Sequence, residues 1–269
     1  MSISVDGPAA RERAAWRAVA IPSEHGGWGL TLEPVVLGLL VTWSWPGVYI
    51  GLAAFGAFVA RTPAKLVAID IRRDRWLERS RVAVRIASAE IALVAALVIA
   101  ATALAGWRWW WAVLVAAPAI AVEAWYEVRS HGRRLVPELC GAAGVSATAA
   151  AIVLAGGGVP RLAAAVSVLL AARSVAAIPF VRAQIMRARR GVTAVRSSDA
   201  AQLGAVALGG LGAALDARVL VGAAALTVIA GLPDWWSRHA PPPVKVIGMR
   251  QMALGLALVA ATAIGVWFG

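Results

Sequence analysis

Nine long apolar runs dominate this chain of 269 residues and leave little room for any other architecture. About 20 apolar residues cross a bilayer as a helix, and each run approaches that length. The runs are rich in Ala, Leu and Val and do not alternate, which excludes the strands of a membrane barrel. The predicted spans are residues 28–45, 47–68, 82–105, 107–127, 135–156, 160–181, 198–215, 217–233 and 246–268.

The composition agrees with a membrane location. Hydrophobic residues make up 61% of the chain, whereas a soluble domain is about half apolar. Because helices satisfy their own backbone in lipid, we expect an all-α, polytopic membrane protein with about nine transmembrane helices. A tail over residues 1–20 precedes a single helical domain over residues 21–269. The one cysteine, Cys140, forms no internal disulfide and builds no zinc site alone.

The net charge of +12 is divided unevenly between the two sides of this bundle. The tail and the longer loops on its side hold 22 of the 26 Lys and Arg residues, and the opposite side holds three. The positive-inside rule assigns the basic side to the cytoplasm, so the N-terminus is expected inside. Topology and contact with anionic lipid explain the charge, and no nucleic-acid partner is expected.

Polar residues within the spans gather at their cytoplasmic ends, close to expected cap loops at residues 69–81 and 182–197. Such residues are costly in lipid and often mark functional sites. Their one-sided clustering suggests a cavity that opens to the cytoplasm. The candidate residues are Glu24, His25, Glu33, Arg61, Lys65, Asp70, Asp74, Glu123, Glu127, Arg173, Arg182 and Lys245.

Asp70 and Asp74 are candidate ligands of a metal ion. On a helix, residues four apart share one face, and two carboxylates on one face suit Mg²⁺, which prefers oxygen ligands. In the alternative interpretation, both aspartates pair with Arg72, Arg73 and Arg75 on a solvated loop.

Glu123 and Glu127 repeat this spacing at the end of the fourth span. Glu127 has an ordinary interpretation as an interfacial residue neutralised by Arg129. Glu123 is deeper and therefore needs a partner or a cavity.

Arg173 is predicted about 10 Å deep in the sixth span, from the helical rise. An unpaired arginine there would cost at least ~2.5 kcal/mol, so Glu33 is its expected partner. The pair is either structural or leaves the guanidinium facing a ligand phosphate, which its fork of donors suits. The basic amphipathic stretch over residues 181–191 is expected to lie on the membrane surface.

The entry to the first span reads IPSEHGGWG. Ser23 and Glu24 suit the N-terminus of a helix, but that interpretation leaves His25 and the deeper Glu33 unexplained. We therefore expect Glu24, His25 and Glu33 to surround the mouth of a cavity.

Five segments together resemble the YwiC-like family of bacterial membrane proteins. They read IPSEHGGWG, DIRRDR, RRLVPELCG, ARSVAAIPFVRAQIMRARR and PVKVIGMRQ, and the resemblance extends from about Ala20 to Phe268. It implies a multi-pass protein of the bacterial cytoplasmic (inner) membrane.

The arrangement of spans also resembles the UbiA superfamily of intramembrane prenyltransferases. That resemblance implies two aspartate-rich motifs that bind Mg²⁺ and a prenyl diphosphate. Asp70 and Asp74 match the last two aspartates of the first motif, whereas Leu66 and Val67 occupy its earlier polar positions. The second motif is absent.

The leading hypothesis is a UbiA-like protein that transfers or processes an isoprenoid or lipid diphosphate with Mg²⁺. Asp70 and Asp74 would hold the metal, and Glu33, Glu123 or Glu127 would orient an acceptor or take its proton. The remaining candidates would contact the substrate: Glu24, His25, Arg61, Lys65, Arg173, Arg182 and Lys245. The alternatives are a transporter or lipid-binding protein without transfer chemistry, and a structural subunit.

Overall fold

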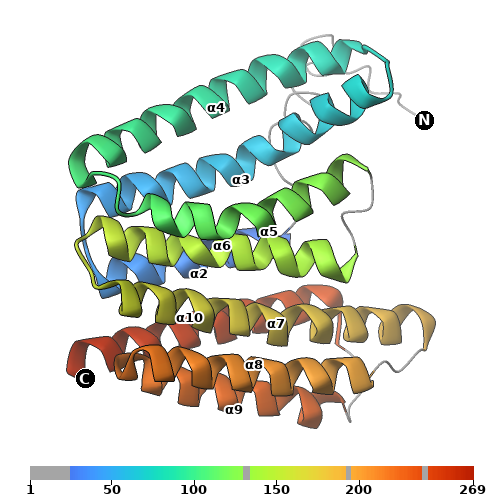
Figure 1. The fold of residues 1–269 in the computed structure, drawn as a ribbon. Coiled ribbons are helices and arrows are strands. Elements are labelled where there is room, and N and C mark those ends of the chain that lie inside the picture. The colour runs from blue at the N-terminus through green and yellow to red at the C-terminus, as the bar shows by residue number, and fades with distance from the viewer. Residues whose placement is uncertain (1–24, 130–133, 192–194, 238–241) are drawn as a thin grey trace, which may run out of the picture.

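The computed structural model describes residues 25–129, 134–191, 195–237 and 242–269. Within these ranges the chain forms nine α-helices, one short 3-10 turn and no strand (Figure 1). The elements are α2 (His25–Val41), α3 (Trp45–Arg72), α4 (Glu78–Ala105), α5 (Trp110–Val128), α6 (Leu135–Ala155), α7 (Pro160–Arg190), α8 (Val195–Leu215), η1 (Ala217–Val219), α9 (Leu220–Ser237) and α10 (Val244–Phe268).

Successive helices run back and forth between two ends of the bundle (Figure 1). Short turns connect them at the left end of Figure 1, as the sequence predicted. Ser44 begins α3 by accepting a hydrogen bond from the Gly47 amide at 3.1 Å. Gly106 and Gly157 adopt positive φ angles of 71° and 84° in the next two turns, a conformation that glycine adopts without steric cost.

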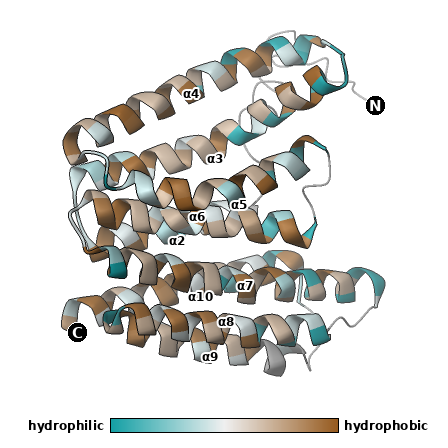
Figure 2. Ribbon diagram, viewed as in Figure 1, coloured by the Kyte–Doolittle hydropathy of each residue, from teal (hydrophilic) through white to brown (hydrophobic). Residues whose placement is uncertain are grey.

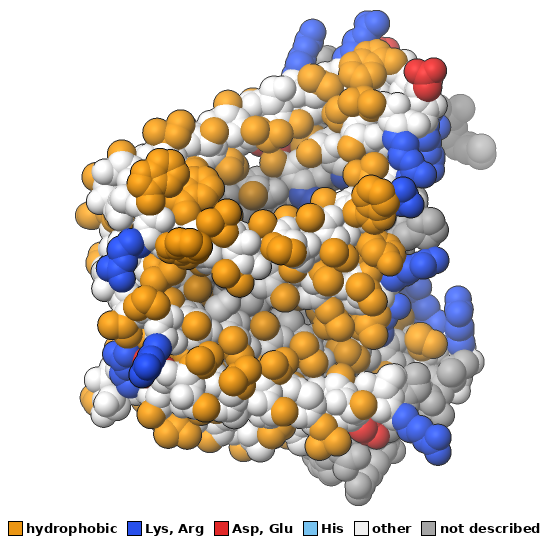
Figure 3. All heavy atoms as spheres, in the orientation of Figure 1, with side chains coloured by type: hydrophobic (Ala, Val, Ile, Leu, Met, Phe, Trp, Pro, Cys, Tyr) orange, Lys and Arg blue, Asp and Glu red, His pale blue; other side chains and the backbone are white. Residues whose placement is uncertain are grey.

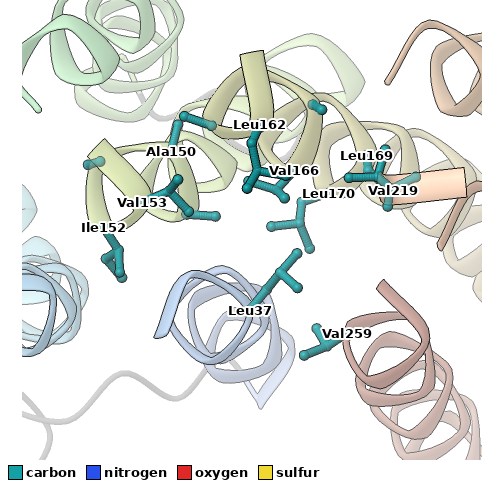
Figure 4. Close-up of a cluster of buried hydrophobic side chains, with 14 of the residues drawn as sticks. Leu37, Ala150, Ile152, Val153, Leu162, Val166, Leu169, Leu170, Val219 and Val259 are labelled. Carbon is teal, nitrogen blue, oxygen red and sulfur yellow. The ribbon is translucent and has the colours of Figure 1, made fainter. Parts of the chain in front are cut away.

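Four helices surround α2, which lies at the centre of the bundle. α2 packs against α6, α7, α10 and α3, and its Leu37 is completely buried. Figure 4 shows Leu37 facing Leu170 of α7, with Ile152 and Val153 of α6 and Val259 of α10 close by. Any polar side chain on the inner face of α2 is therefore held among apolar neighbours.

The α3–α4 hairpin lies at one edge of the bundle, where α4 packs chiefly against α3. Many large apolar side chains of α4 point outward, among them Ile91, Leu93 and Ile99. Figure 2 shows apolar residues along the middle of the helices and polar residues at their ends. This distribution suits a lipid environment around the hairpin.

Six of the described helices are long and apolar enough to cross a membrane: α3, α4, α5, α6, α7 and α10. Gly27–Val41 and Ala217–Leu232 are shorter apolar helical segments. The prediction of an all-α polytopic membrane protein is confirmed. The helices match the nine predicted spans closely, except that α7 continues well beyond residue 181.

The residues expected as cap loops are largely helical. Residues 69–72 belong to α3, residues 78–81 to α4 and residues 182–190 to α7, which ends at Gly191 with a φ of 65°. At 31 residues, α7 is roughly 46 Å long, whereas the hydrocarbon core is about 30 Å thick. The basic stretch from Val181 thus continues α7 rather than forming a separate surface segment.

Candidate functional site

Lys and Arg side chains gather at one end of the bundle, which we call the basic end. Figure 3 shows them along its right side, with only small groups at the opposite end. The basic end comprises the ends of α3, α5, α7 and α9 and the beginnings of α2, α4, α6, α8 and α10. Within the described residues it holds three ion-pair clusters and one buried arginine.

Arg61 of α3 joins two carboxylates of α5. Its Nε donates to Glu127 Oε2 at 2.9 Å, and one terminal nitrogen lies 2.6 Å from Glu127 Oε1 and 2.7 Å from Glu123 Oε1. Lys65 Nζ also donates to Glu127, at 3.2 Å. Two bases thus balance two acids, an arrangement that stabilises the contact between α3 and α5.

Glu123 is further constrained by Gly141 of α6. A Cβ atom built on Gly141 would overlap the Glu123 carboxyl group. The glycine therefore leaves the space that the carboxyl occupies between α5 and α6. Glu123 has the partner that its depth in the span required, namely Arg61.

Asp70 is 1% exposed and closes the α3–α4 hairpin. Its Oδ2 accepts a hydrogen bond from Ser80 at 2.7 Å, and its Oδ1 accepts from Arg75 Nε at 3.2 Å. Arg79 adds an ion pair at 3.5 Å. Both carboxylate oxygens are therefore engaged by protein donors.

Asp74 does not share a helical face with Asp70. α3 ends at Arg72, and Asp74 is exposed with a φ of 47° in the turn that follows. Among the described residues, no three or more His, Cys, Asp or Glu side chains gather to hold a metal ion. Asp70 and Asp74 thus do not fit a shared Mg²⁺ in this arrangement, and we derive no step through a metal.

Arg182 of α7 contacts Glu138 of α6 at 2.8 Å. Both side chains are partly exposed, so this bond adds little to stability. Arg182 therefore lies at the basic end as expected, on the outer part of α7.

Arg173 differs from these residues because it is 2% exposed and contacts no carboxylate within the described ranges. One terminal nitrogen donates to both oxygens of Gln251 on α10, at 2.7 Å to the backbone oxygen and 2.9 Å to Oε1. Its Nε is buried without an acceptor among the described residues. A guanidinium that keeps an unused buried donor is suited to a polar or anionic ligand.

The predicted ion pair between Glu33 and Arg173 is therefore wrong as a direct contact. No ion pair joins the two side chains in the described part of the chain. Gln251 provides closer acceptors. The arginine consequently lacks a bound counter-charge.

Glu33 is 6% exposed, and its carboxyl group lies against Gly255 of α10. No hydrogen-bond donor contacts it in the described residues. The next residue, Pro34, has no amide hydrogen, which deprives the carbonyl of Leu30 of its usual helical donor. Pro34 therefore frees one backbone acceptor of α2 close to Glu33.

A small cavity adjoins Gln251 on the side towards the basic end. Its volume is about 40 Å³, close to the space that one water molecule takes in the liquid. Arg173 does not line this cavity and is itself buried, so a ligand reaches it only if α10 moves away from α7. The cavity is lined by Phe180, Gln184, Trp236, Pro242, Ile247, Arg250 and Gln251.

Three predicted site residues remain. Glu24 lies outside the described residues. His25 begins α2, and nothing is described of its side chain. Lys245 is exposed in the first turn of α10.

The sequence reasoning missed two features of the site. Gln251 is not among the candidate residues, because nothing in the sequence around it predicted that it would bind Arg173. Glu90 of α4 was overlooked, although it lies within a predicted span and its Oε2 is buried without a partner. A search of each span for every ionisable residue would have found Glu90.

The family comparison covers the first half of this arrangement. Residues 21–153 match the model of the family described as YwiC-like protein. Glu33, Arg61 and Glu127 lie within the match, whereas Arg173 and Gln251 lie beyond it. No curated protein and no solved structure matches the chain. The predicted resemblance to the YwiC-like family is thus confirmed over residues 21–153.

Proposed function

We propose that this membrane protein binds the phosphate group of a lipid or isoprenoid diphosphate between α7 and α10, with Arg173 as the main contact. The observation that carries the proposal is the buried Arg173 Nε, which has no acceptor among the described residues. The two oxygens of Gln251 occupy another guanidinium nitrogen. A ligand phosphate would displace the Gln251 side chain and use both donors as a fork.

The surrounding geometry favours binding without prenyl transfer. Transfer of the UbiA type would use Asp70 with Mg²⁺, but Ser80, Arg75 and Arg79 already engage Asp70. Glu123 and Glu127 are likewise engaged by Arg61. The proposed role is thus that of a transporter or lipid-binding protein, in which the ligand leaves intact.

The charge at the basic end supports an anionic ligand. Arg182, Arg187, Arg189 and Arg190 extend along the outer part of α7, and Arg250 lines the cavity next to Gln251. These groups would attract a phosphate towards the site from the membrane surface. We place this end in the cytoplasm of a bacterial cell, on the positive-inside rule.

Binding of farnesyl diphosphate to the full-length protein in phosphatidylcholine nanodiscs tests this function. We expect saturable binding that persists in EDTA, because the guanidinium supplies the positive charge. Arg173→Gln should weaken binding at least ~10-fold, the loss expected for one charge-assisted hydrogen bond. Mass spectrometry should recover the ligand unchanged.

Two further variants control the result. Arg161→Gln removes an exposed charge from the opposite end of the same helix and should change the affinity less than about twofold, because exposed charges are screened by salt. Gln251→Ala removes the competing side chain and should leave binding equal or tighter. Equal binding by wild type and Arg173→Gln would contradict the proposal, and a strict requirement for Mg²⁺ would favour a UbiA-type site instead.

A further inference from the structure

Glu33 is a buried acid on α2, and its carboxyl group lies against α10, one of the two helices of the proposed ligand site. It is 6% exposed, and the described residues give it neither a hydrogen-bond donor nor an ion-pair partner. Its carboxyl group lies against Gly255, which is one helical turn after Gln251, the residue that binds Arg173. Glu33 and Arg173 thus form a loosely coupled charge pair within an apolar core.

The helices packed around Glu33 offer no other charge that could replace Arg173. α10 presents Gly255 to its carboxyl group. The remaining charged residues at the basic end of the neighbouring helices are either exposed or engaged elsewhere. They are Lys245 and Arg250 on α10, Arg61, Lys65, Asp70 and Arg72 on α3, Glu138 on α6, and Arg182, Arg187, Arg189 and Arg190 on α7.

Binding of an anion to Arg173 changes the charge balance of this core. With Glu33 ionised, two negative charges would then surround one guanidinium, and like charges repel strongly where water is excluded. For a group with one negative charge, such as a sulfonate, a proton on Glu33 restores neutrality, and for a phosphate it lowers the excess negative charge by one. Gly255 leaves room for the carboxyl group in either state of protonation.

We propose that Glu33 takes up one proton when the anionic group binds Arg173, so that ligand and proton bind together. The inference rests on the proposed function. The proton adds to a Glu33 oxygen from solvent, and no other bond forms or breaks. The cavity beside Gln251 and Gln184 lies between Arg173 and the basic end, which gives the proton a polar approach from that side.

The proposal can be tested through the pH dependence of ligand affinity, because proton uptake on binding makes affinity depend on pH. If one proton is taken up, the affinity for the anion rises about tenfold for each unit by which the pH falls, within the range where Glu33 titrates. The probe must keep a constant charge over that range, so farnesyl sulfonate replaces the diphosphate. Binding is measured in phosphatidylcholine nanodiscs as before.

Three proteins are compared: wild type, Glu33→Gln and Glu90→Gln. Glu90→Gln removes the other incompletely satisfied carboxyl group, which lies on α4 outside the α2–α7–α10 core. We expect the pH dependence in wild type and Glu90→Gln. Glu33→Gln should bind independently of pH, with the affinity that wild type reaches in acid.

A second measurement needs no variant. Calorimetry of wild type in two buffers with different enthalpies of ionisation counts the protons taken up on binding. A value near one supports the inference. A value near zero, or an unchanged pH dependence in Glu33→Gln, overturns it and leaves the binding function intact. Failure of wild type to bind either farnesyl sulfonate or farnesyl diphosphate at any pH overturns the binding function itself.

Discussion

The carboxyl group of Glu33 on α2 occupies the space in front of Gly255 on α10 that a Cβ atom would otherwise fill. The two helices approach each other at this point because one residue lacks a side chain. The contact places an acid in the core of the bundle, one turn of α10 away from Gln251, which binds Arg173.

Gly255→Ala should therefore destabilise the protein by about 1–3 kcal/mol, the range for overpacking a filled core. Gly248→Ala is the matched control, because a Cβ at that position on the same helix meets nothing within 4 Å. Thermal unfolding in detergent measures both. In a Glu33→Ala background, Gly255→Ala should cost less stability, because the carboxyl group that the new methyl group would meet is gone. The effects of two mutations in contact are not additive. Equal melting temperatures for the two glycine variants would rule out the close contact.

Arg61 is expected to stabilise the contact between α3 and α5. Arg61→Met leaves Glu127 largely buried with Lys65 as its remaining described partner, which should cost about 1–3 kcal/mol. Arg73→Met removes an exposed arginine from the same end and should change stability by less than about 0.5 kcal/mol. Denaturation of both variants in the same detergent compares their losses of stability. A larger loss for Arg73→Met than for Arg61→Met would contradict this prediction.

Ser80 should contribute through its bond to the buried Asp70. Ser80→Ala deprives Asp70 Oδ2 of a donor at 2.7 Å and should destabilise the hairpin by about 1–3 kcal/mol. Ser88→Ala, on an exposed part of α4, is the control. Hydrogen exchange of residues 69–81 should rise in Ser80→Ala alone, and unchanged protection would show that the bond is unimportant.

Asp216, in the turn after α8, gives a prediction about pH. Its Oδ2 lies 2.7 Å from Arg218, and the hydrogen bonds from Arg218 hold the pKa of Asp216 below its ordinary value. A lowered pKa in the folded state stabilises the protein above the ordinary pKa of aspartate, and this stabilisation is lost as the pH falls through the lowered value. The difference in melting temperature between wild type and Asp216→Asn should thus be larger at neutral pH than below about pH 4. A constant difference would contradict the assignment.

The positions of the helices could be predicted from the sequence because apolar run length and turn residues act locally. The runs around Leu37 and Leu170 lie where the spans were expected, and Gly106 and Gly157 lie in the expected turns. The extension of α7 to Arg190 was missed because the apolar run ends where the arginines begin, whereas the helix continues until Gly191.

The contacts of the site could not be predicted in the same way. The spacing of Asp70 and Asp74 implies a shared face only while the helix continues, and α3 ends between them at Arg72. Glu33 and Arg173 were matched by charge alone. Which acceptor reaches a buried guanidinium depends on the rotation and depth of three helices, and here that acceptor is Gln251.

A cryo-EM reconstruction of the full-length protein with farnesyl diphosphate in phosphatidylcholine nanodiscs tests the central claim most directly. The account predicts phosphate density at hydrogen-bond distance from Arg173 Nε, about 3 Å, with the Gln251 side chain displaced. Arg173 still bound to Gln251, with the phosphate density beside Arg61 and Lys65 or absent, would contradict it.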